Sequence, residues 1–321
     1  MKQNIIRRGK TLSAKRRSDL LVYCLLLVFP VVQFLVFYVC VNFNSILLAF
    51  KDYTPMLSAD GQIIGFEYAM VGLKQFKSVI ADIFGVNPEL RVAIKNSLIV
   101  YAIKVAITTT LSLLFSYYIF KKFVGSEIFK VFLFIPSIVS GLVMCIIFAN
   151  LVDRIYSQIS FDMTGEYAYG LLSQEETRFA TITFFSIWAS FGTGILMYTG
   201  TMSRISPAIL EAGKIDGTNH LQEFIHIIIP LSWSTISTIL VVGIVGVFID
   251  RNSVYSFYGA SYPEPSVLTL GYWTYRKTQL AQLDEYSYLS AFGLLETLII
   301  VPITLAVRWA FNRMSWSDVE V

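Results

Sequence analysis

"EAGKIDGTNHLQEFIHIIIP", residues 211–230, is a polar, glycine-containing stretch between two long apolar runs, FFSIWASFGTGILMYTG (184–200) and STILVVGIVGVFI (237–249). Ser206-Pro207 is typical of a helix start, because serine can cap and proline is tolerated at the first helical position. Asp216-Gly217 is a stop signal. Asn219, with Gln222 three residues later, is a capping-box pattern that starts a second helix. The stretch therefore predicts a helical hairpin, residues 206–230, between two apolar segments.

The composition around this helical hairpin is that of a membrane protein. Of the 321 residues, 55% are hydrophobic and 15% are charged, whereas soluble domains average about 25% charged residues. The mean hydropathy is +0.63. A net charge of +3 is too small to indicate nucleic-acid binding, and three cysteines inside apolar runs with two histidines lack metal-ligand spacing.

Six apolar segments reach the roughly 20 residues that a spanning helix needs. They predict an all-α integral membrane protein with spans near 20–41, 93–120, 128–149, 179–200, 231–250 and 286–309. We expect a basic tail (1–19), one transmembrane domain (20–311) that contains the loop 204–230, and a short C-terminal tail (312–321). The long loop 42–92 contains FEYAMVGLKQFKSVIADIF, whose spaced apolar residues predict short helices on the membrane surface.

The distribution of basic residues predicts the orientation. With the N-terminus inside, the cytoplasmic segments carry 14 Lys and Arg against 7 Asp and Glu, while the outer loops carry 9 against 14. Cytoplasmic loops are enriched in Lys and Arg, so we predict that both termini and the helical hairpin face the cytoplasm.

The exposed side of the helical hairpin combines acidic and small residues. Glu211, Asp216 and Glu223 are expected to lie there beside Ala212, Gly213 and Gly217. One reading is an amphipathic hairpin that rests on lipid. A lipid-binding face is usually rich in lysine, however, and carboxylates beside small residues suit close contact with a basic protein partner. We therefore favour a protein-docking surface.

These residues resemble the cytoplasmic EAA loop of permeases of type I ATP-binding cassette (ABC) importers, in the carbohydrate branch that includes maltose-type and oligosaccharide permeases. The matching residues are Glu211, Ala212, Asp216, Gly217, Phe224 and Pro230; Gly213 replaces the usual second alanine, and Ile229 stands where leucine is more common. The resemblance extends to VGLKQFKSVI, AIKNSLIVYAI and EYSYLSAFGLLETLII, and so covers most of the chain.

The resemblance implies a fold and a set of partners. We expect the six-helix fold of type I permeases and a multi-pass protein of the bacterial plasma membrane. The chain would pair with a second, homologous permease, two ABC ATPases and an extracellular solute-binding protein. ATP and Mg²⁺ would bind to the ATPase, so this chain would be no enzyme and hold no cofactor. Glu211 would pair with a basic residue of the ATPase, and Gly217 would form the turn of the helical hairpin.

Polar and small residues in the fourth and fifth spans are candidates for the cargo pathway, because a sugar needs aromatic or apolar faces and hydrogen-bonding groups. By their position relative to the EAA loop they resemble the sugar-contacting stretches of maltose-type permeases, although the side chains differ. The candidates are Trp188, Ser190, Thr193, Gly243, Gly246 and Asp250. For the two glycines, close helix packing is the favoured alternative; for Trp188, packing and contact are equally supported.

Two ionisable residues lie deep in predicted spans. Lys104 and Glu296 are each about ten to twelve residues from the outer end of a helix, and at a rise of about 1.5 Å per residue they share a depth. An unpaired charge is costly there, so we predict a Lys104–Glu296 contact, direct or through one water, and favour a structural role over sugar binding.

Other functions remain as alternatives. The EAA loop does not specify the cargo, so an importer of polyamines or phosphate is the second hypothesis. An ion-coupled carrier would usually carry internal repeats, and none is evident. A membrane enzyme is disfavoured because no nucleophile, metal cluster or carboxylate pair is arranged for chemistry.

Overall fold

The computed structural model describes residues 14–57, 63–259 and 265–314. Apart from one β-hairpin, the regular structure of these residues is helical. Six helices are long and apolar enough to cross a membrane, the number that hydropathy predicts: Val22–Leu48, Pro88–Phe120, Gly141–Thr164, Glu175–Met202, Trp233–Tyr258 and Glu285–Arg313.

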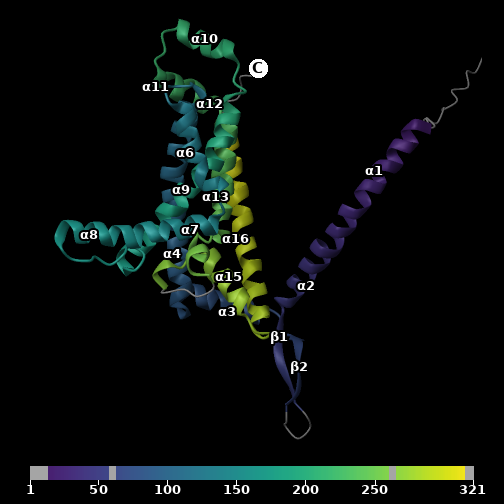
Figure 1. Ribbon diagram of the computed structural model, residues 1–321. Coiled ribbons are helices and arrows are strands. Elements are labelled where there is room, and N and C mark those ends of the chain that lie inside the picture. The colour runs from purple at the N-terminus through teal and green to yellow at the C-terminus, as the bar shows by residue number, and fades with distance from the viewer. Residues whose placement is uncertain (1–13, 58–62, 260–264, 315–321) are drawn as a thin grey trace, which may run out of the picture.

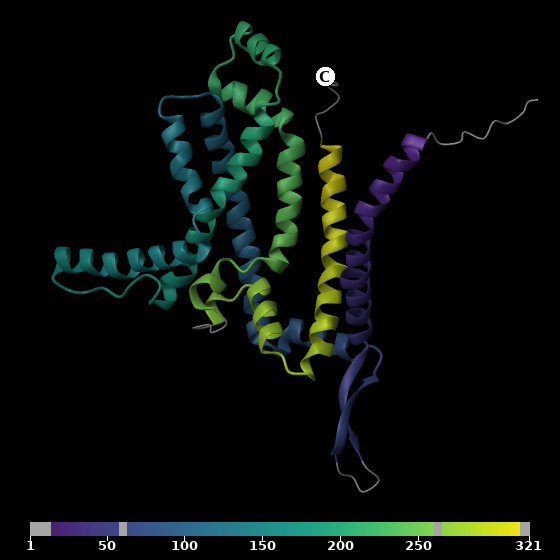
Figure 2. The same ribbon diagram turned by 45° about the vertical axis from the view of Figure 1, so that its right-hand side comes forward.

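Four of the long helices run side by side and form the bundle (Figure 1, Figure 2). The first combines α4 (Pro88–Ile103) and α5 (Thr110–Phe120) through a π-helical segment, Lys104–Thr109. The others are α9 (Glu175–Met202), α13 (Trp233–Ile249) and α16 (Glu285–Arg313). The α5 helix packs on α9, and α13 contacts α4, α9 and α16. The helix α13 therefore lies between α4 and α16.

The first apolar helix leaves this bundle. It comprises α1 (Ala14–Gln33), a π-helical segment (Phe34–Cys40) and α2 (Val41–Leu48). The α2 end contacts α16, whereas α1 leans away from the other helices (Figure 1). The described side chains of α1, from Val22 onwards, are exposed although they are mostly apolar.

The third predicted span, 128–149, is not one continuous helix. The chain forms α6 (Ser126–Ile138), which packs on α9, and then breaks at Val139, whose φ of −74° and ψ of 145° are extended. It resumes as α7 (Gly141–Asn150), the π-helical segment Leu151–Ile155 and α8 (Tyr156–Thr164), which run across the direction of the bundle (Figure 1). Hydropathy does not detect such a bend because both arms are apolar.

The long loop after α2 contains a β-hairpin where helices were predicted. Strands β1 (Lys51–Leu57) and β2 (Ile63–Met70) pair antiparallel, so the helical prediction for the FEYAM part is wrong. Cross-strand aromatic contacts stabilise the pairing: the Tyr53 ring lies 5.1 Å from Phe66 and 5.0 Å from Tyr68. A short helix is confirmed in α3 (Lys74–Ala81), which continues into the π-helical segment Asp82–Val86 with a kink at Gly85; its place on the membrane surface stays a prediction.

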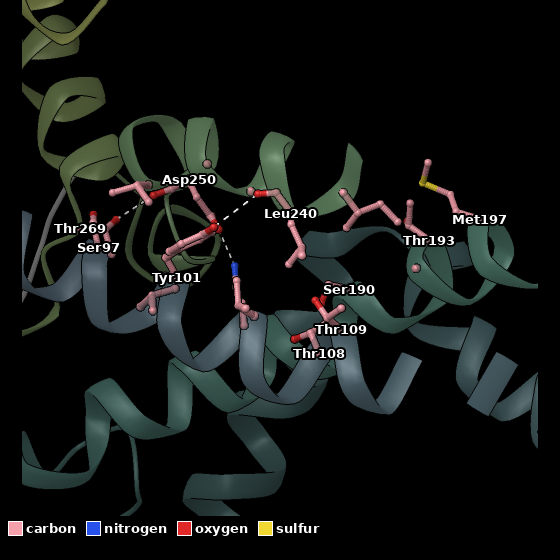
Figure 3. Close-up of a pocket in the computed structure, with 18 residues that line it drawn as sticks. Ser97, Tyr101, Thr108, Thr109, Ser190, Thr193, Met197, Leu240, Asp250 and Thr269 are labelled. Carbon is pink, nitrogen blue, oxygen red and sulfur yellow. Dashed lines mark hydrogen bonds and ion pairs between the residues drawn. The ribbon is translucent and has the colours of Figure 1, made fainter. Parts of the chain in front are cut away.

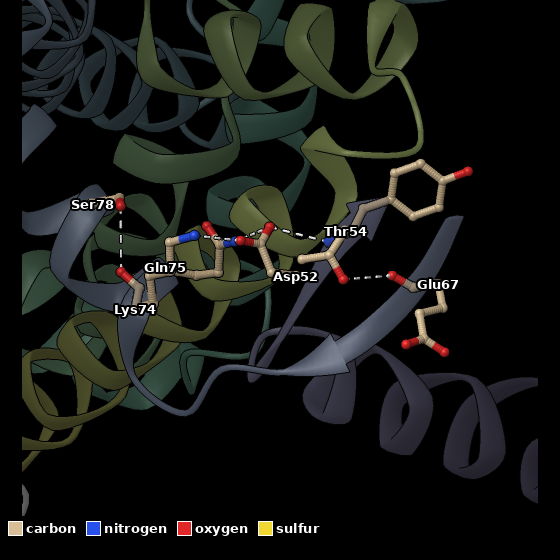
Figure 4. A network of polar contacts seen from close by, with 7 residues as sticks. Asp52, Thr54, Glu67, Lys74, Gln75 and Ser78 are labelled. Carbon is tan, nitrogen blue, oxygen red and sulfur yellow. Dashed lines mark hydrogen bonds and ion pairs between the residues drawn. The ribbon is translucent and has the colours of Figure 1, made fainter. Parts of the chain in front are cut away.

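Asp52 joins the β-hairpin to α3 (Figure 4). Its carboxylate accepts hydrogen bonds from Lys74 Nζ at 2.6 Å and Gln75 Nε2 at 2.9 Å. On the other side, the Tyr68 hydroxyl donates to the Leu283 carbonyl at 2.8 Å, just before α16. The β-hairpin therefore has a defined base.

The remaining short helices lie at the two ends of the bundle. The end of the bundle where the β-hairpin lies also holds α14 (Val254–Tyr258), a 3-10 turn (Pro265–Val267) and α15 (Leu270–Leu280). At the opposite end are α10 (Pro207–Ile215), α11 (His220–Glu223), the π-helical segment Phe224–Ile228 and α12 (Ile229–Leu231) (Figure 1). The polar stretch that interrupts the apolar runs thus forms a separate cap on the bundle.

Candidate functional site

The helical hairpin, residues 206–230, has the helix, turn and capping box that its sequence predicts, although the Ser206 side chain forms no capping hydrogen bond. The first helix starts at Pro207 after Ser206 and ends at Ile215, and Gly217 adopts a φ of +80° in the turn. Asn219 and Gln222 form both bonds of the capping box. Asn219 Oδ1 accepts from the backbone N–H of Gln222 at 2.8 Å, and Gln222 Oε1 accepts from the backbone N–H of Asn219 at 2.9 Å. Short-range chemistry therefore determines this element.

The predicted docking residues divide into an exposed and a buried group. Glu211, Ala212, Asp216 and Gly217 are exposed, as the docking interpretation requires. Gly213 is buried. A Cβ at this position would lie only 2.7 Å from Ile227 Cδ1. The expectation that Gly213 belongs to the exposed side is wrong: its small size lets the two halves of the helical hairpin approach each other.

Glu223 is also buried, contrary to the prediction. Its carboxylate is bound by Lys121 Nζ at 2.9 and 3.0 Å, and the side chain is 2% exposed. Phe224 is buried next to it against Tyr117, and Pro230 is half-buried. Glu223 and Phe224 therefore fasten the helical hairpin to the bundle. The capping box predicts that Glu223 lies in the first turn of α11. Its burial depends on α5 lying beside α11, which the local sequence does not determine.

A cavity of about 300 Å³ lies between α4–α5, α9 and α13 (Figure 3). Five of the six predicted pathway residues line it: Ser190, Thr193, Gly243, Gly246 and Asp250. The sixth, Trp188, does not; its ring packs 6.1 Å from Phe185 and 6.3 Å from Phe148. For Trp188 the structure supports the packing alternative.

Lys104 pairs with Asp250 and not with Glu296. Its ammonium contacts Asp250 Oδ2 (Figure 3), and the other oxygen of that carboxylate accepts from the Asn252 amide at 2.7 Å. The predicted Lys104–Glu296 contact is wrong because depth does not specify lateral position. Glu296 is on α16, and α13 lies between α16 and the helix of Lys104. Oε1 of Glu296 is buried and has no hydrogen-bond partner among the described residues.

The two glycines of α13 differ in their surroundings. A Cβ on Gly243 would lie 3.0 Å from the Tyr101 ring, so this glycine permits close packing, as the alternative interpretation predicted. A Cβ on Gly246 would meet nothing within 4 Å. Gly246 therefore leaves open space in the cavity wall.

Several cavity residues were not predicted. Tyr101, Thr108 and Thr109 come from the first bundle helix, and Thr269 comes from the segment before α15. The Tyr101 hydroxyl donates to the Leu240 carbonyl at 3.4 Å, whereas Thr108 Oγ1 is buried with no hydrogen-bond partner among the described residues. The three threonines in AIKVAITTT were an available signal, since hydroxyls in an apolar span need partners. Within the described part of the chain, no three His, Cys, Asp or Glu side chains are placed to hold a metal ion.

Comparisons with known proteins agree with this architecture. Residues 109–315 match the family model of the binding-protein-dependent transport system inner membrane component. The polygalacturonan/rhamnogalacturonan transport system permease protein YteP of Bacillus subtilis is 25% identical over 300 residues, which cover 90% of this chain and 87% of that protein. The arabinooligosaccharides transport system permease protein AraP of the same organism is 24% identical over 280 residues, covering 86% and 83%.

A solved structure shares the fold. A chain of a bacterial ABC transporter involved in the import of the acidic polysaccharide alginate superposes with a TM-score of 0.71 at 17% identity. The match covers 95% of this chain and 98% of that chain. The chain therefore belongs to the family of binding-protein-dependent transport system inner membrane components, and it is a multi-pass inner-membrane protein.

Proposed function

We propose that this chain is a permease subunit of an ATP-driven, binding-protein-dependent importer of oligosaccharides. Family membership and the transport-system permeases among its relatives support the general function. The observation that carries the cargo class is the cavity of α4–α5, α9 and α13, which contains aromatic, apolar and hydroxyl groups suited to a sugar.

The charges of the cavity favour an uncharged cargo over the second hypothesis. Lys104 and Asp250 both line it, and each is the other's ion-pair partner. A polyamine site would need uncompensated acidic groups, and a phosphate site would need uncompensated cations. Thr108 Oγ1, which lacks a partner among the described residues, could exchange a hydrogen bond with a sugar hydroxyl.

The helical hairpin is proposed to dock in a separate ABC ATPase. Its exposed α10 side carries Glu211, Ala212 and Asp216, and Gly217 keeps the adjoining turn small. In this proposal Glu211 pairs with a basic residue of the ATPase, and ATP and Mg²⁺ bind there and not to this chain. A solute-binding protein would deliver cargo from the outer side.

A second, homologous permease is proposed to complete the pathway as a heterodimer. The exposure of α1 supports such a partner, because its described apolar side chains are not covered by the bundle of their own chain. Lipid alone could solvate α1, but a second permease would bury it.

The test is to co-purify this chain with its candidate ATPase and companion permease, then measure ATP hydrolysis with and without sugar-loaded binding protein. We expect stimulation by one loaded binding protein, and its loss in Glu211→Ala. Glu127→Ala is the matched control, because Glu127 is an exposed carboxylate at the start of α6, at the same end of the bundle. Failure of the ATPase to bind the wild-type chain would refute the importer assignment, and full stimulation of Glu211→Ala would refute the role of Glu211.

A further inference from the structure

The α11 half of the helical hairpin is fastened to the end of α5 by three adjacent contacts. Lys121, immediately after α5, forms the two-pronged ion pair with Glu223 at 2.9 and 3.0 Å. The Tyr117 hydroxyl donates to the His220 carbonyl at 3.1 Å, and the Phe224 ring lies 5.1 Å from the Tyr117 ring. The α10 half carries the exposed Glu211. Among the described residues it forms no side-chain hydrogen bond or ion pair with the bundle, and Leu210 packs on the apolar cluster that includes Tyr117 and Phe224.

The burial of the Lys121–Glu223 pair suggests a role beyond stability. The two side chains are 12% and 2% exposed. Removing charges from water is costly, so a buried ion pair contributes little net stability compared with apolar packing. Separating such a pair is expensive, however, because it leaves an uncompensated charge in a medium of low dielectric constant. A buried pair therefore fixes the relative position of two elements, whereas apolar surfaces can slide.

The Lys121–Glu223 pair connects α4–α5, one wall of the cavity, to the helical hairpin. The other two walls are already joined to the helical hairpin by the chain itself. The cavity is lined by α4–α5, α9 and α13. The α9 helix ends at Met202, a few residues before α10, and α13 begins at Trp233 directly after α12. Those two walls are covalently continuous with the helical hairpin. The α4–α5 helix is distant in sequence, and Lys121–Glu223 is its ion-pair connection.

The same helix reaches the cavity through a π-helical segment. Lys104, Val105, Thr108 and Thr109 belong to Lys104–Thr109 and line the cavity. π-Helical turns occur frequently at functional sites and are wider than α-helical turns. Movement of the inner end of α5 can therefore change the side chains that face the cavity by altering this segment.

We infer that the Lys121–Glu223 pair transmits movement of the helical hairpin to the cavity, along α5 and into the segment Lys104–Thr109. Lys121 and Glu223 are positioning residues for transport: they touch neither cargo nor nucleotide. The inference rests on the proposed function, because it takes the ATPase as the source of the movement. It adds that breaking the pair uncouples ATP hydrolysis from cargo transport.

The test uses the complete importer reconstituted in lipid vesicles, with sugar uptake and ATP hydrolysis measured in the same sample. The variants are Lys121→Met and Glu223→Gln, with the reversed pair Lys121→Glu/Glu223→Lys as rescue. Lys122→Met is the matched control, since Lys122 is the adjacent lysine and is exposed. We expect each single variant to retain its ATPase subunits but to import about tenfold less sugar per ATP, within the usual range of coupling between sites. The reversed pair should restore the ratio.

Hydrogen exchange provides a readout that a purely structural role would not move. In the wild type, trapping the ATPase with ATP and vanadate should change exchange at Lys104–Thr109, and Glu223→Gln should abolish that change. If the reversed pair fails to accumulate, Glu223→Asp, which keeps the charge on a shorter side chain, should give an intermediate ratio. A wild-type ratio in both single variants would refute the inference, and loss of the ATPase subunits from both would assign the pair to assembly instead. Neither result would affect the proposed function, which fails only if the wild-type complex shows no coupling.

Discussion

Lys104 and Asp250 are the residues whose pairing most changes the interpretation of the cavity. Their side chains are 23% and 37% exposed, so the pair is only partly desolvated. Asp250 stands at the end of α13, where the Thr269 hydroxyl also donates to its carbonyl at 3.0 Å. The pair thus joins the π-helical segment Lys104–Thr109, the end of α13 and the segment before α15 at one point.

A double-mutant cycle tests this pairing. We expect Lys104→Met and Asp250→Asn each to lower the free energy of unfolding in detergent micelles, and the double variant to lose less than the sum, with a coupling of about 1 kcal/mol. The parallel cycle of Lys104→Met with Glu296→Gln should be additive within about 0.5 kcal/mol, because no contact joins these residues. Coupling in the second cycle together with additivity in the first would contradict the Lys104–Asp250 pair and support the Lys104–Glu296 contact that was predicted from depth.

Gly271 permits the close approach of α15 to the end of α13. A Cβ there would lie 2.4 Å from the carbonyl carbon of Ile249 and 2.8 Å from the Asp250 nitrogen, and backbone atoms cannot rotate away. We therefore expect Gly271→Ala to destabilise the protein by about 3 kcal/mol, measured by equilibrium unfolding. Gly200→Ala is the control, since a Cβ at Gly200 of α9 would meet nothing within 4 Å. Equal stability of the two variants would contradict this packing.

At the scale of elements, local and tertiary determinants separate clearly. Gly217 and the Asn219–Gln222 capping box determine the helical hairpin by short-range chemistry, so its outline was predictable. The prediction of one continuous helix over 128–149 was wrong because the bend at Val139 does not alter hydropathy. The β-hairpin failed for a different reason: spaced apolar residues fit a short amphipathic helix as well as a strand, and only the pairing of β1 with β2 decides between them.

The capping box makes a measurable contribution to the helical hairpin. Asn219→Ala removes the acceptor for the Gln222 amide, and loss of such a cap typically costs about 1 kcal/mol. We expect faster hydrogen exchange in α11, and Asn219→Ser should restore protection because serine also caps. Unchanged exchange in Asn219→Ala would mean that the contacts of Glu223 and Phe224 hold α11 without its cap.

At the scale of the whole molecule, the bundle has two chemically different ends. The helical hairpin lies at one end and the β-hairpin with α15 at the other (Figure 2). The excess of Lys and Arg in the segments at the helical-hairpin end predicts that this end faces the cytoplasm.

Cysteine labelling tests this orientation. After replacement of Cys24, Cys40 and Cys145, single cysteines would be introduced by Gln158→Cys in α8 and Ser203→Cys after α9, both at exposed positions. A membrane-impermeant maleimide should label Gln158→Cys on intact cells and Ser203→Cys only after permeabilisation. The opposite pattern would reverse the assigned topology.

The sequence by itself determined the helical membrane class, the number of apolar helices, the local structure of the helical hairpin and five residues of the cavity wall. These properties depend on hydropathy and on interactions within a few residues along the chain. Tertiary structure alone decided that Lys104 pairs with Asp250, that Glu223 is buried on Lys121, and that Gly213 faces Ile227. A sequence gives the depth of a residue along its helix, but the residue's neighbours depend on which helices lie beside it and on the direction each one faces, and packing of the whole bundle sets both.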